Sequence, residues 1–158
     1  MINTLNTDVL LIPIDREGTA RGYSGTLPEM AIEVSRATAE LYARDGFDEP
    51  WIGYFAFADD TLVGTCAYKA KPHNGRVEIA YFTFPEFEGR GYASAMAARL
   101  VAIARQHSSS LTVAAQTLPV RNASHRVLEK LGFQHVDTID HPDDGVVWEW
   151  QLKDEISA

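Results

Sequence analysis

The sequence predicts a single α/β domain, residues 1–158, in which helices pack against a mixed sheet. Three observations support this fold class. Of the 158 residues, 46% are hydrophobic and 23% are charged, which suffices for one core and is short for two domains. Short runs of β-branched and aromatic residues alternate with runs of helical periodicity. No repeat, low-complexity tract or linker interrupts this order.

The N-terminal third predicts a strand followed by a helical region. Residues 9–14 form an apolar run that a charged, glycine-containing turn ends, so we expect the first strand there. Residues 29–44 carry apolar side chains at helical spacing and are closed by Gly46, which predicts one or two helices.

The middle of the chain predicts three successive antiparallel strands. Residues 51–58 and 62–70 are apolar and are joined by a short Asp-Asp-Thr turn, which is typical of a hairpin. A turn cluster at 71–75 leads into residues 76–84, which are rich in β-branched and aromatic residues and are stopped by Pro85.

The C-terminal part predicts another strand, a short helix and a closing hairpin. Residues 111–116 form the strand. Asn122 is typical of a helix N-cap and Gly132 of the helix end, with an apolar stripe between them. Residues 133–139 and 146–152 are expected to pair as the hairpin.

A glycine turn, with Gly89 and Gly91, joins the strand at 76–84 to an Ala-rich run at 95–104 that predicts a helix. The first turn of a helix has N–H groups without partners and a partial positive charge. Glycines at this point let an anion approach the backbone. The turn at 87–94 therefore predicts a phosphate-binding site; the alternative is a tight connection without a ligand.

Two common phosphate-binding motifs are excluded. The chain has no Walker loop, Gly-x-x-x-x-Gly-Lys-Ser/Thr. A dinucleotide fingerprint requires a third glycine where Ser94 stands and an acidic residue about 20 residues later, whereas residues 107–115 contain neither Asp nor Glu. The remaining candidate is a pyrophosphate whose attached chain lies beside the preceding strand, as in coenzyme A.

Two runs of residues resemble a known family. Glu88-Gly89-Arg90-Gly91-Tyr92-Ala93 resembles the acetyl-CoA loop of the GNAT N-acetyltransferases. The run from Asn122 to Phe133, which contains Val-Leu-Glu-Lys-Leu-Gly-Phe, resembles the helix and strand entry that follow in that family. The order and separation of the two runs also match, and the resemblance favours the branch that acetylates ribosomal-protein N-termini (RimJ/RimL-like).

The resemblance implies a mixed, mostly antiparallel sheet that is flanked by helices on both faces and splayed where acetyl-CoA enters. In the family, the strand before the loop pairs with the pantetheine arm through its backbone. The residues that the resemblance places at the cosubstrate are Phe82, Thr83, Phe84, Glu88, Gly89, Arg90, Gly91, Tyr92, Ala93, Ser94 and Asn122.

For catalysis, the resemblance implies a general base at Glu78, because the family often has glutamate at this point of the strand. Its neighbours Val77 and Ile79 are apolar, and a part-buried carboxylate in such surroundings accepts a proton more readily. The alternative is an outward-facing glutamate paired with Arg76.

Ser124 is the candidate hydrogen-bond partner of the leaving thiolate, since the resemblance places its hydroxyl near the sulfur at the start of the helix. The alternative is a hydrogen bond within the first helical turn. Leu128 stands where many relatives carry a tyrosine that protonates the thiolate, and the RimJ/RimL-like branch also tends to lack that tyrosine.

The net charge of −8 disfavours nucleic acid as the main partner and favours cationic ligands, amines included. We expect an amine acceptor, either a protein N-terminus or a small molecule, and a monomer or a homodimer. No run of about 18 apolar residues predicts a membrane span. Residues 1–8 lack signal-peptide features, so the expected location is the cytoplasm.

No metal is expected, because the five histidines share no ligand spacing with a cysteine or an acidic pair. Cys66 is the only cysteine and is expected in the core. The sequence thus predicts an N-acetyltransferase that moves an acetyl group directly from acetyl-CoA to a primary amine in a ternary complex, since no side chain stands out as an acyl-carrying nucleophile. The alternatives are a non-catalytic acyl-CoA-binding or sensor protein of the same fold, and a nucleotide-binding module.

Overall fold

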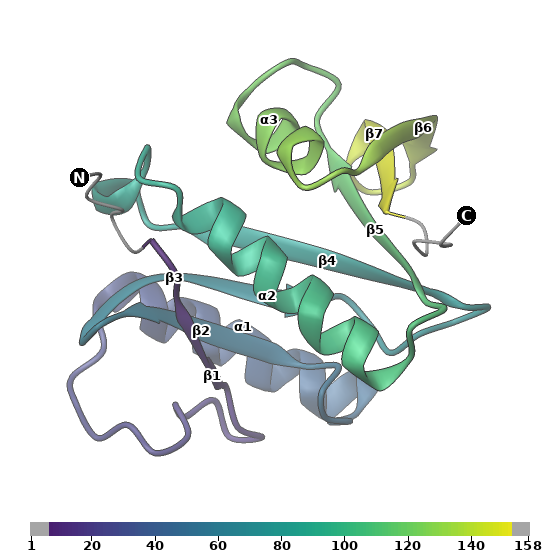
Figure 1. Ribbon diagram of the computed structural model, residues 1–158. Helices are drawn as coiled ribbons and strands as arrows, with labels where there is room; N and C mark the ends of the chain where they lie inside the picture. The colour runs from purple at the N-terminus through teal and green to yellow at the C-terminus, as the bar shows by residue number, and fades with distance from the viewer. Residues whose placement is uncertain (1–6, 153–158) are drawn as a thin grey trace.

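A seven-stranded sheet organises the molecule, with the strand order β1-β2-β3-β4-β5-β7-β6 (Figure 1). The computed structural model describes residues 7–152. Neighbouring strands are antiparallel except β4 and β5, which are parallel, so the sheet is mixed and mostly antiparallel as predicted. The strands are β1 (Leu10–Pro13), β2 (Gly53–Ala58), β3 (Thr61–Tyr68), β4 (Arg76–Thr83), β5 (Thr112–Thr117), β6 (Gln134–His141) and β7 (Gly145–Leu152).

Within residues 7–152, three α-helices pack around this sheet: α1 (Glu29–Asp45), α2 (Tyr92–His107) and α3 (Ala123–Lys130). The region predicted to hold one or two helices is the single helix α1. Helix α1 lies behind the sheet and α2 in front of it (Figure 1), which confirms the expectation of helices on both faces.

Helix α2 packs against the front face of the sheet and contributes buried side chains to the core. It begins at Tyr92, three residues before the predicted start, because Gly91 with φ of +89° ends the loop directly and the next residues continue as helix. Met96 and Leu100 are fully buried, as expected from their spacing. Cys66 on β3 is also buried, which confirms its place in the core.

Gly64 on β3 lets the neighbouring strand β4 approach closely. A Cβ atom at this position would lie 2.3 Å from the carbonyl oxygen of Phe82 and 3.0 Å from the methyl carbon of Met96. Only glycine therefore permits both the β3–β4 pairing and the seat of α2 on it.

The sheet is split between β4 and β5. Their parallel pairing covers three residues on each strand and ends at Glu78 and Ala114. Beyond that point β4 continues along β3, where the Phe84 N–H donates to the Val63 carbonyl at 2.9 Å, while β5 continues along β7. The carboxyl ends of β4 and β5 consequently separate, and the predicted splay is present.

No helix within residues 7–152 is long and apolar enough to span a membrane. Residues 1–6, which contribute to the expectation about a signal peptide, lie outside the described part of the chain.

Candidate active site

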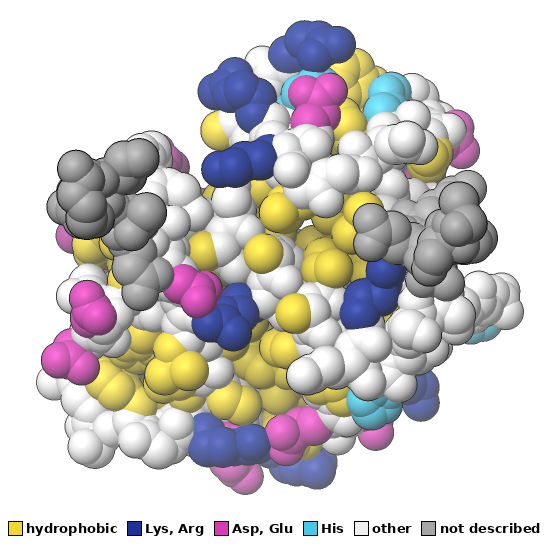
Figure 2. Space-filling model, in the orientation of Figure 1, with side chains coloured by type: hydrophobic (Ala, Val, Ile, Leu, Met, Phe, Trp, Pro, Cys, Tyr) yellow, Lys and Arg dark blue, Asp and Glu magenta, His cyan; other side chains and the backbone are white. Residues whose placement is uncertain are grey.

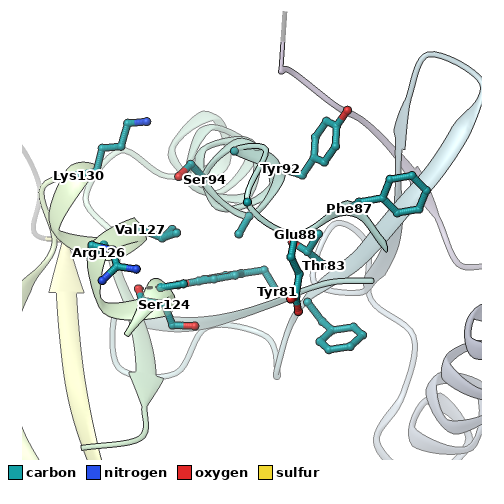
Figure 3. A pocket seen from close by; sticks show the side chains of 15 residues that line it. Tyr81, Thr83, Phe87, Glu88, Tyr92, Ser94, Ser124, Arg126, Val127 and Lys130 are labelled. Carbon is teal, nitrogen blue, oxygen red and sulfur yellow. Dashed lines mark hydrogen bonds between the residues drawn. The ribbon is translucent and has the colours of Figure 1, made fainter. Parts of the chain in front are cut away.

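A cleft of about 690 Å³ opens at the split in the sheet (Figure 3). One wall is the end of β4. The second wall is the turn before α2 together with the first residues of that helix, and the third is the exposed face of α3. The residues that line it are Tyr81, Phe82, Thr83, Phe87, Glu88, Gly89, Gly91, Tyr92, Ala93, Ser94, Ala123, Ser124, Arg126, Val127 and Lys130. The structure thus brings the two sequence motifs together across one cavity.

The glycine turn presents backbone N–H groups to this cleft. Gly89 and Gly91 have φ of +79° and +89°, which favours glycine, and a Cβ at Gly89 would meet no atom within 4 Å. The N–H groups of Gly89, Arg90 and Gly91 have no acceptor within residues 7–152. Because α2 begins immediately afterwards without a side-chain cap, its first N–H groups add to them. This arrangement suits an anion.

The backbone edge of β4 is available to a ligand at alternate residues. Hydrogen bonds from Lys69 N–H to the Glu78 carbonyl and from Phe84 N–H to Val63 show that even-numbered residues pair with β3. The backbone groups of Tyr81 and Thr83 therefore face the side that β5 has left. Of the three residues expected to pair with the pantetheine arm, Thr83 faces the split and the backbone of Phe82 and Phe84 faces β3.

Side chains at the end of β4 behave differently from one another. The ring of Phe82 is 47% exposed and lines the cleft, whereas Phe84 is buried in the core. The hydroxyl of Thr83 is buried and has no hydrogen-bond partner in the described part of the chain. A ligand in the cleft can therefore supply the partner that Thr83 lacks.

Helix α3 contributes Ser124 to the cleft. Asn122 caps this helix by accepting a hydrogen bond from the His125 N–H at 3.3 Å, which confirms its N-cap role, and it does not line the cleft. The ring of Tyr81 extends across the cleft to this helix, where its hydroxyl donates to the Ser124 carbonyl at 3.4 Å (Figure 3). Leu128 is fully buried.

Two basic residues in the cleft were missed by the sequence reasoning. Arg126 and Lys130 lie one turn apart on α3, and both line the cavity. Basic side chains gather over α3, beside the hollow between α3 and α2 (Figure 2). Their spacing of four residues was the available signal, because it places both on the face away from buried Leu128. In a chain of net charge −8 they supply positive charge for phosphate groups.

The remaining residues that were expected at the cosubstrate differ in whether they line the cleft. Glu88, Tyr92, Ala93 and Ser94 line the cleft as expected. The side chain of Arg90 does not; its guanidinium lies over the Phe87 ring at 5.7 Å from the centroid. Arg90 is absent from the cleft lining altogether, so the structure does not bring this expected residue to the cosubstrate site.

Glu78 lies at the base of the split, on the face opposite to Tyr81, because side chains alternate along a strand. Its surroundings differ from the apolar ones that the sequence suggested. The carboxylate contacts Lys69 Nζ at 2.9 Å and Arg76 Nη2 at 3.4 Å, and its side chain is 13% exposed. The ion pair with Arg76, the alternative reading of this residue, is present, and Lys69 joins it because it follows β3 directly beside Glu78.

A buried carboxylate on β7, Glu149, completes this polar cluster. Arg76 binds it through two hydrogen bonds, Nη2 to Oε1 at 2.7 Å and Nε to Oε2 at 3.0 Å, and Gln116 and Gln151 donate to it as well. Burial raises the pKa of Glu149, but these hydrogen bonds outweigh burial and the net pKa is lowered. The pair ties β4 to the C-terminal half of the sheet.

No cluster of three or more metal-ligating side chains occurs in residues 7–152. Burial raises the pKa of the Tyr81 hydroxyl to about 12, so the phenol is protonated at neutral pH. The cleft can therefore offer backbone N–H groups, two cations, hydroxyl groups and the Glu88 carboxylate to a ligand. Glu78 lies on the opposite face and is not part of the cleft lining.

Residues 10–134 match the acetyltransferase (GNAT) domain family. The N-acetylaspartate synthetase of Rattus norvegicus is 33% identical over 89 residues, which are 56% of this chain and 29% of the relative. The human N-acetylaspartate synthetase is 32% identical over 89 residues, with the same coverage. The chain therefore spans less than a third of the length of these curated relatives.

Solved structures share the architecture. The Salmonella typhimurium protein yncA, solved with its cofactor acetyl-CoA, has a TM-score of 0.64 at 16% identity and covers 96% of each chain. The microcin C7 self-immunity acetyltransferase MccE, in complex with acetyl-CoA and AMP, has a TM-score of 0.63 at 16% identity over 82% of this chain and 77% of that one. RimL, the ribosomal L7/L12 α-N-protein acetyltransferase, has a TM-score of 0.60 at 18% identity over 82% and 73%. At these identities the likeness establishes the fold.

Proposed function

The chain belongs to the GNAT acetyltransferase family, and from this premise we propose that it is an acetyl-CoA-dependent N-acetyltransferase acting on a primary amine. The observation that carries the proposal is the pair of unpaired N–H groups at Gly89 and Gly91, two residues that line the same cleft as the free edge of β4. A diphosphate and a chain with amide groups are the two chemistries that these features bind.

The residues of this cleft fit coenzyme A. The turn N–H groups would hold the diphosphate, and Arg126 and Lys130 would add charge contacts to its phosphates. The backbone of Tyr81 and Thr83 would pair with the pantetheine amides, and the Thr83 hydroxyl would gain a partner. Glu88, Tyr92, Ala93 and Ser94 would shape the loop side, while Asn122 would act by fixing the start of α3.

When bound, acetyl-CoA supplies an acetyl group on a thioester that an amine can attack directly. Backbone N–H groups of the β4 edge would donate to the carbonyl oxygen, a contribution of about 3 kcal/mol for a preorganised donor. Glu78, on the opposite face of the split, would take the proton from the acceptor amine, and Ser124, which lines the cleft, would hydrogen-bond the leaving sulfur. No metal is required by this scheme.

The acceptor is proposed as a primary amine of one of two kinds. The RimL neighbour, by its name, modifies a protein N-terminus, and the curated relatives are named for a small amino-acid product. The acidic character of this chain suits either amine. A protein N-terminus remains the first candidate, because the run from Asn122 to Phe133 resembles that branch.

Thermal unfolding with CoA, ATP and NAD tests the cofactor proposal. Ligand at about 100 times its Kd stabilises the native state by about 2.7 kcal/mol. For a chain of this size we expect CoA to raise the Tm by roughly 5–10 °C, while ATP and NAD leave it nearly unchanged. An equal or larger shift with NAD or ATP would contradict the proposal and favour a nucleotide-binding module.

A panel of peptides with free N-termini and of small amines, amino acids included, tests the reaction. CoA release from acetyl-CoA in the presence of at least one amine is the expected outcome. Binding of CoA without release by any amine would favour a non-catalytic acyl-CoA sensor.

A further inference from the structure

We propose that the hydroxyl of Tyr81, supplied by strand β4, donates the hydrogen bond that stabilises the sulfur of CoA as it leaves. This inference rests on the proposed function, since it requires CoA in the cleft. It concerns a residue that the sequence motifs do not single out.

The length of the pantetheine arm places the sulfur near Tyr81. The arm has about thirteen backbone bonds between the diphosphate and the sulfur, which is roughly four residues of extended chain at about 3.3 Å each. An arm that starts at the N–H groups of Gly89 and Gly91 and follows β4 past Thr83 therefore ends beside Tyr81 and the start of α3. These residues all line the one cleft.

The Tyr81 hydroxyl is held at this place by a weak contact. Its hydrogen bond to the Ser124 carbonyl is 3.4 Å long, at the outer limit for an O–H donor, whereas such bonds are commonly near 2.8 Å. The ring spans the cleft and fixes the hydroxyl at the first turn of α3 (Figure 3). A thiolate in the cleft is a stronger acceptor than this carbonyl and can take over the donor.

Helix α3 offers few hydrogen-bond donors to the sulfur. Leu128 is fully buried and does not line the cleft, so the middle of α3 presents no hydroxyl there. Ser124 is the other hydroxyl at this point, and its neighbour Ala123 exposes the first turn of the helix. Tyr81 reaches the same place from the opposite wall, so the sulfur would lie between the two.

The relative acidities decide how Tyr81 acts. Its pKa of about 12 exceeds the ordinary value of about 8.5 for a cysteine thiol, so the phenol keeps its proton beside a thiol of this class. The C–S bond breaks with its electron pair on sulfur as the new C–N bond forms, and the amine proton leaves through the base to solvent. The thiolate takes a hydrogen bond from Tyr81 and gains its own proton from water.

The test is a pH titration of the thiol of bound CoA, followed by thiolate absorbance against a desulfo-CoA reference. It requires no knowledge of the acceptor. Cys66 is the only cysteine and is buried, and burial raises the pKa of its thiol, so the protein adds no thiolate signal near neutral pH. Wild-type protein should lower the pKa of the bound thiol below that of free CoA.

The Tyr81→Phe variant should raise the pKa of the bound thiol by about 1 unit or more, a tenfold change in acid dissociation, because a hydrogen bond to a charged group is lost. Arg126, Lys130 and Glu88 also line the cleft, but they are present in both proteins and do not contribute to the difference. Tyr54→Phe, which removes another buried phenol that does not line the cleft, is the matched control and should leave the value unchanged.

Equal thiol pKa values in wild type and Tyr81→Phe would overturn the assignment of Tyr81 while leaving the proposed function intact. A wild-type value no lower than that of free CoA would overturn it as well, independently of any variant. A larger effect for Ser124→Ala than for Tyr81→Phe would transfer the role to the serine. Failure of CoA to bind the wild type at all would overturn the proposed function and this assignment together.

Discussion

Among single residues, Glu78 has the most demanding role in the proposed reaction, because it must exchange an ion pair for an acceptor amine. Lys69 is 48% exposed and sits on a flexible side chain, so its contact with Glu78 is easily broken. Arg76 is held in place by the buried carboxylate of Glu149. We infer that Arg76 keeps the Glu78 carboxylate in place, while the acceptor amine replaces Lys69 as its second partner.

Replacing Glu78 with Gln tests its role as base. We expect kcat to fall by roughly 10²- to 10⁴-fold, because general base catalysis is lost, while CoA still raises the Tm. The measurement is CoA release with an amine that the wild type accepts. Glu86→Gln, at an exposed position outside the cleft, should keep wild-type turnover. Undiminished turnover in Glu78→Gln would remove this residue from the mechanism.

Glu149 governs stability towards acid. Its folded-state pKa lies below the ordinary value of 4.5, so the ionised form favours folding. That contribution is complete above about pH 4.5 and is lost as the pH falls through the lower folded-state value. Glu149→Gln should cost about 1–3 kcal/mol at neutral pH and less near pH 3.

Urea unfolding at the two pH values measures the difference between the proteins. Asp140→Asn on β6, at an exposed position, serves as the control and should differ little from wild type at either pH. A Glu149→Gln deficit that is the same at both pH values would show that the carboxylate charge is not the cause.

At the scale of elements, the turn before α2 combines a backbone requirement with a binding role. A comparison of Gly89 with Gly75 distinguishes the backbone requirement from the binding role. Both glycines have positive φ, +79° and +75°, and a Cβ at either would meet nothing within 4 Å. Alanine at each should cost a similar amount of stability, about 1–2 kcal/mol, from the left-handed backbone alone.

Only Gly89→Ala should also weaken CoA binding, by at least tenfold, because its methyl group would occupy the space from which a phosphate approaches the N–H groups. Calorimetric titration with CoA measures this. Equal CoA affinity of the Gly89→Ala and Gly75→Ala variants would place the diphosphate elsewhere.

The elements themselves could be predicted because their signals are local. Apolar periodicity and turn residues gave every strand of the described chain and the stripe of Met96 and Leu100 on α2. The charged surroundings of Glu78 could not be predicted in the same way. Strand pairing alone brings Lys69 to Glu78 and Glu149 to Arg76, the partner of Glu78. The pairing of the Phe84 backbone with β3, which makes it unavailable to the pantetheine arm, could not be predicted either. It depends on which edge of β4 remains unpaired.

At the scale of the whole molecule, the two halves of the sheet meet through a short parallel pairing that ends at Glu78 and through the Arg76–Glu149 pair. A ligand in the split would pair with the alternate residues of β4 that face it. We therefore expect CoA to slow amide hydrogen exchange at Tyr81 and Thr83 by tenfold or more, and far less at Phe82 and Phe84.

Residue-resolved exchange by NMR, with and without CoA, measures this pattern. The pairing of β1 with β2 lies outside the cleft and is the internal reference. Slowing of equal size at all four residues and in the paired strands β1 and β2 would indicate general stabilisation rather than pairing in the split.

The unpaired stretch of β4 also has a consequence for inhibition. Where a strand edge ends without a neighbour, any extended backbone of suitable length can take that place. A short peptidomimetic with an anionic group at one end would satisfy both the β4 edge and the N–H groups before α2. Such a compound would exclude the acyl donor without resembling a nucleotide.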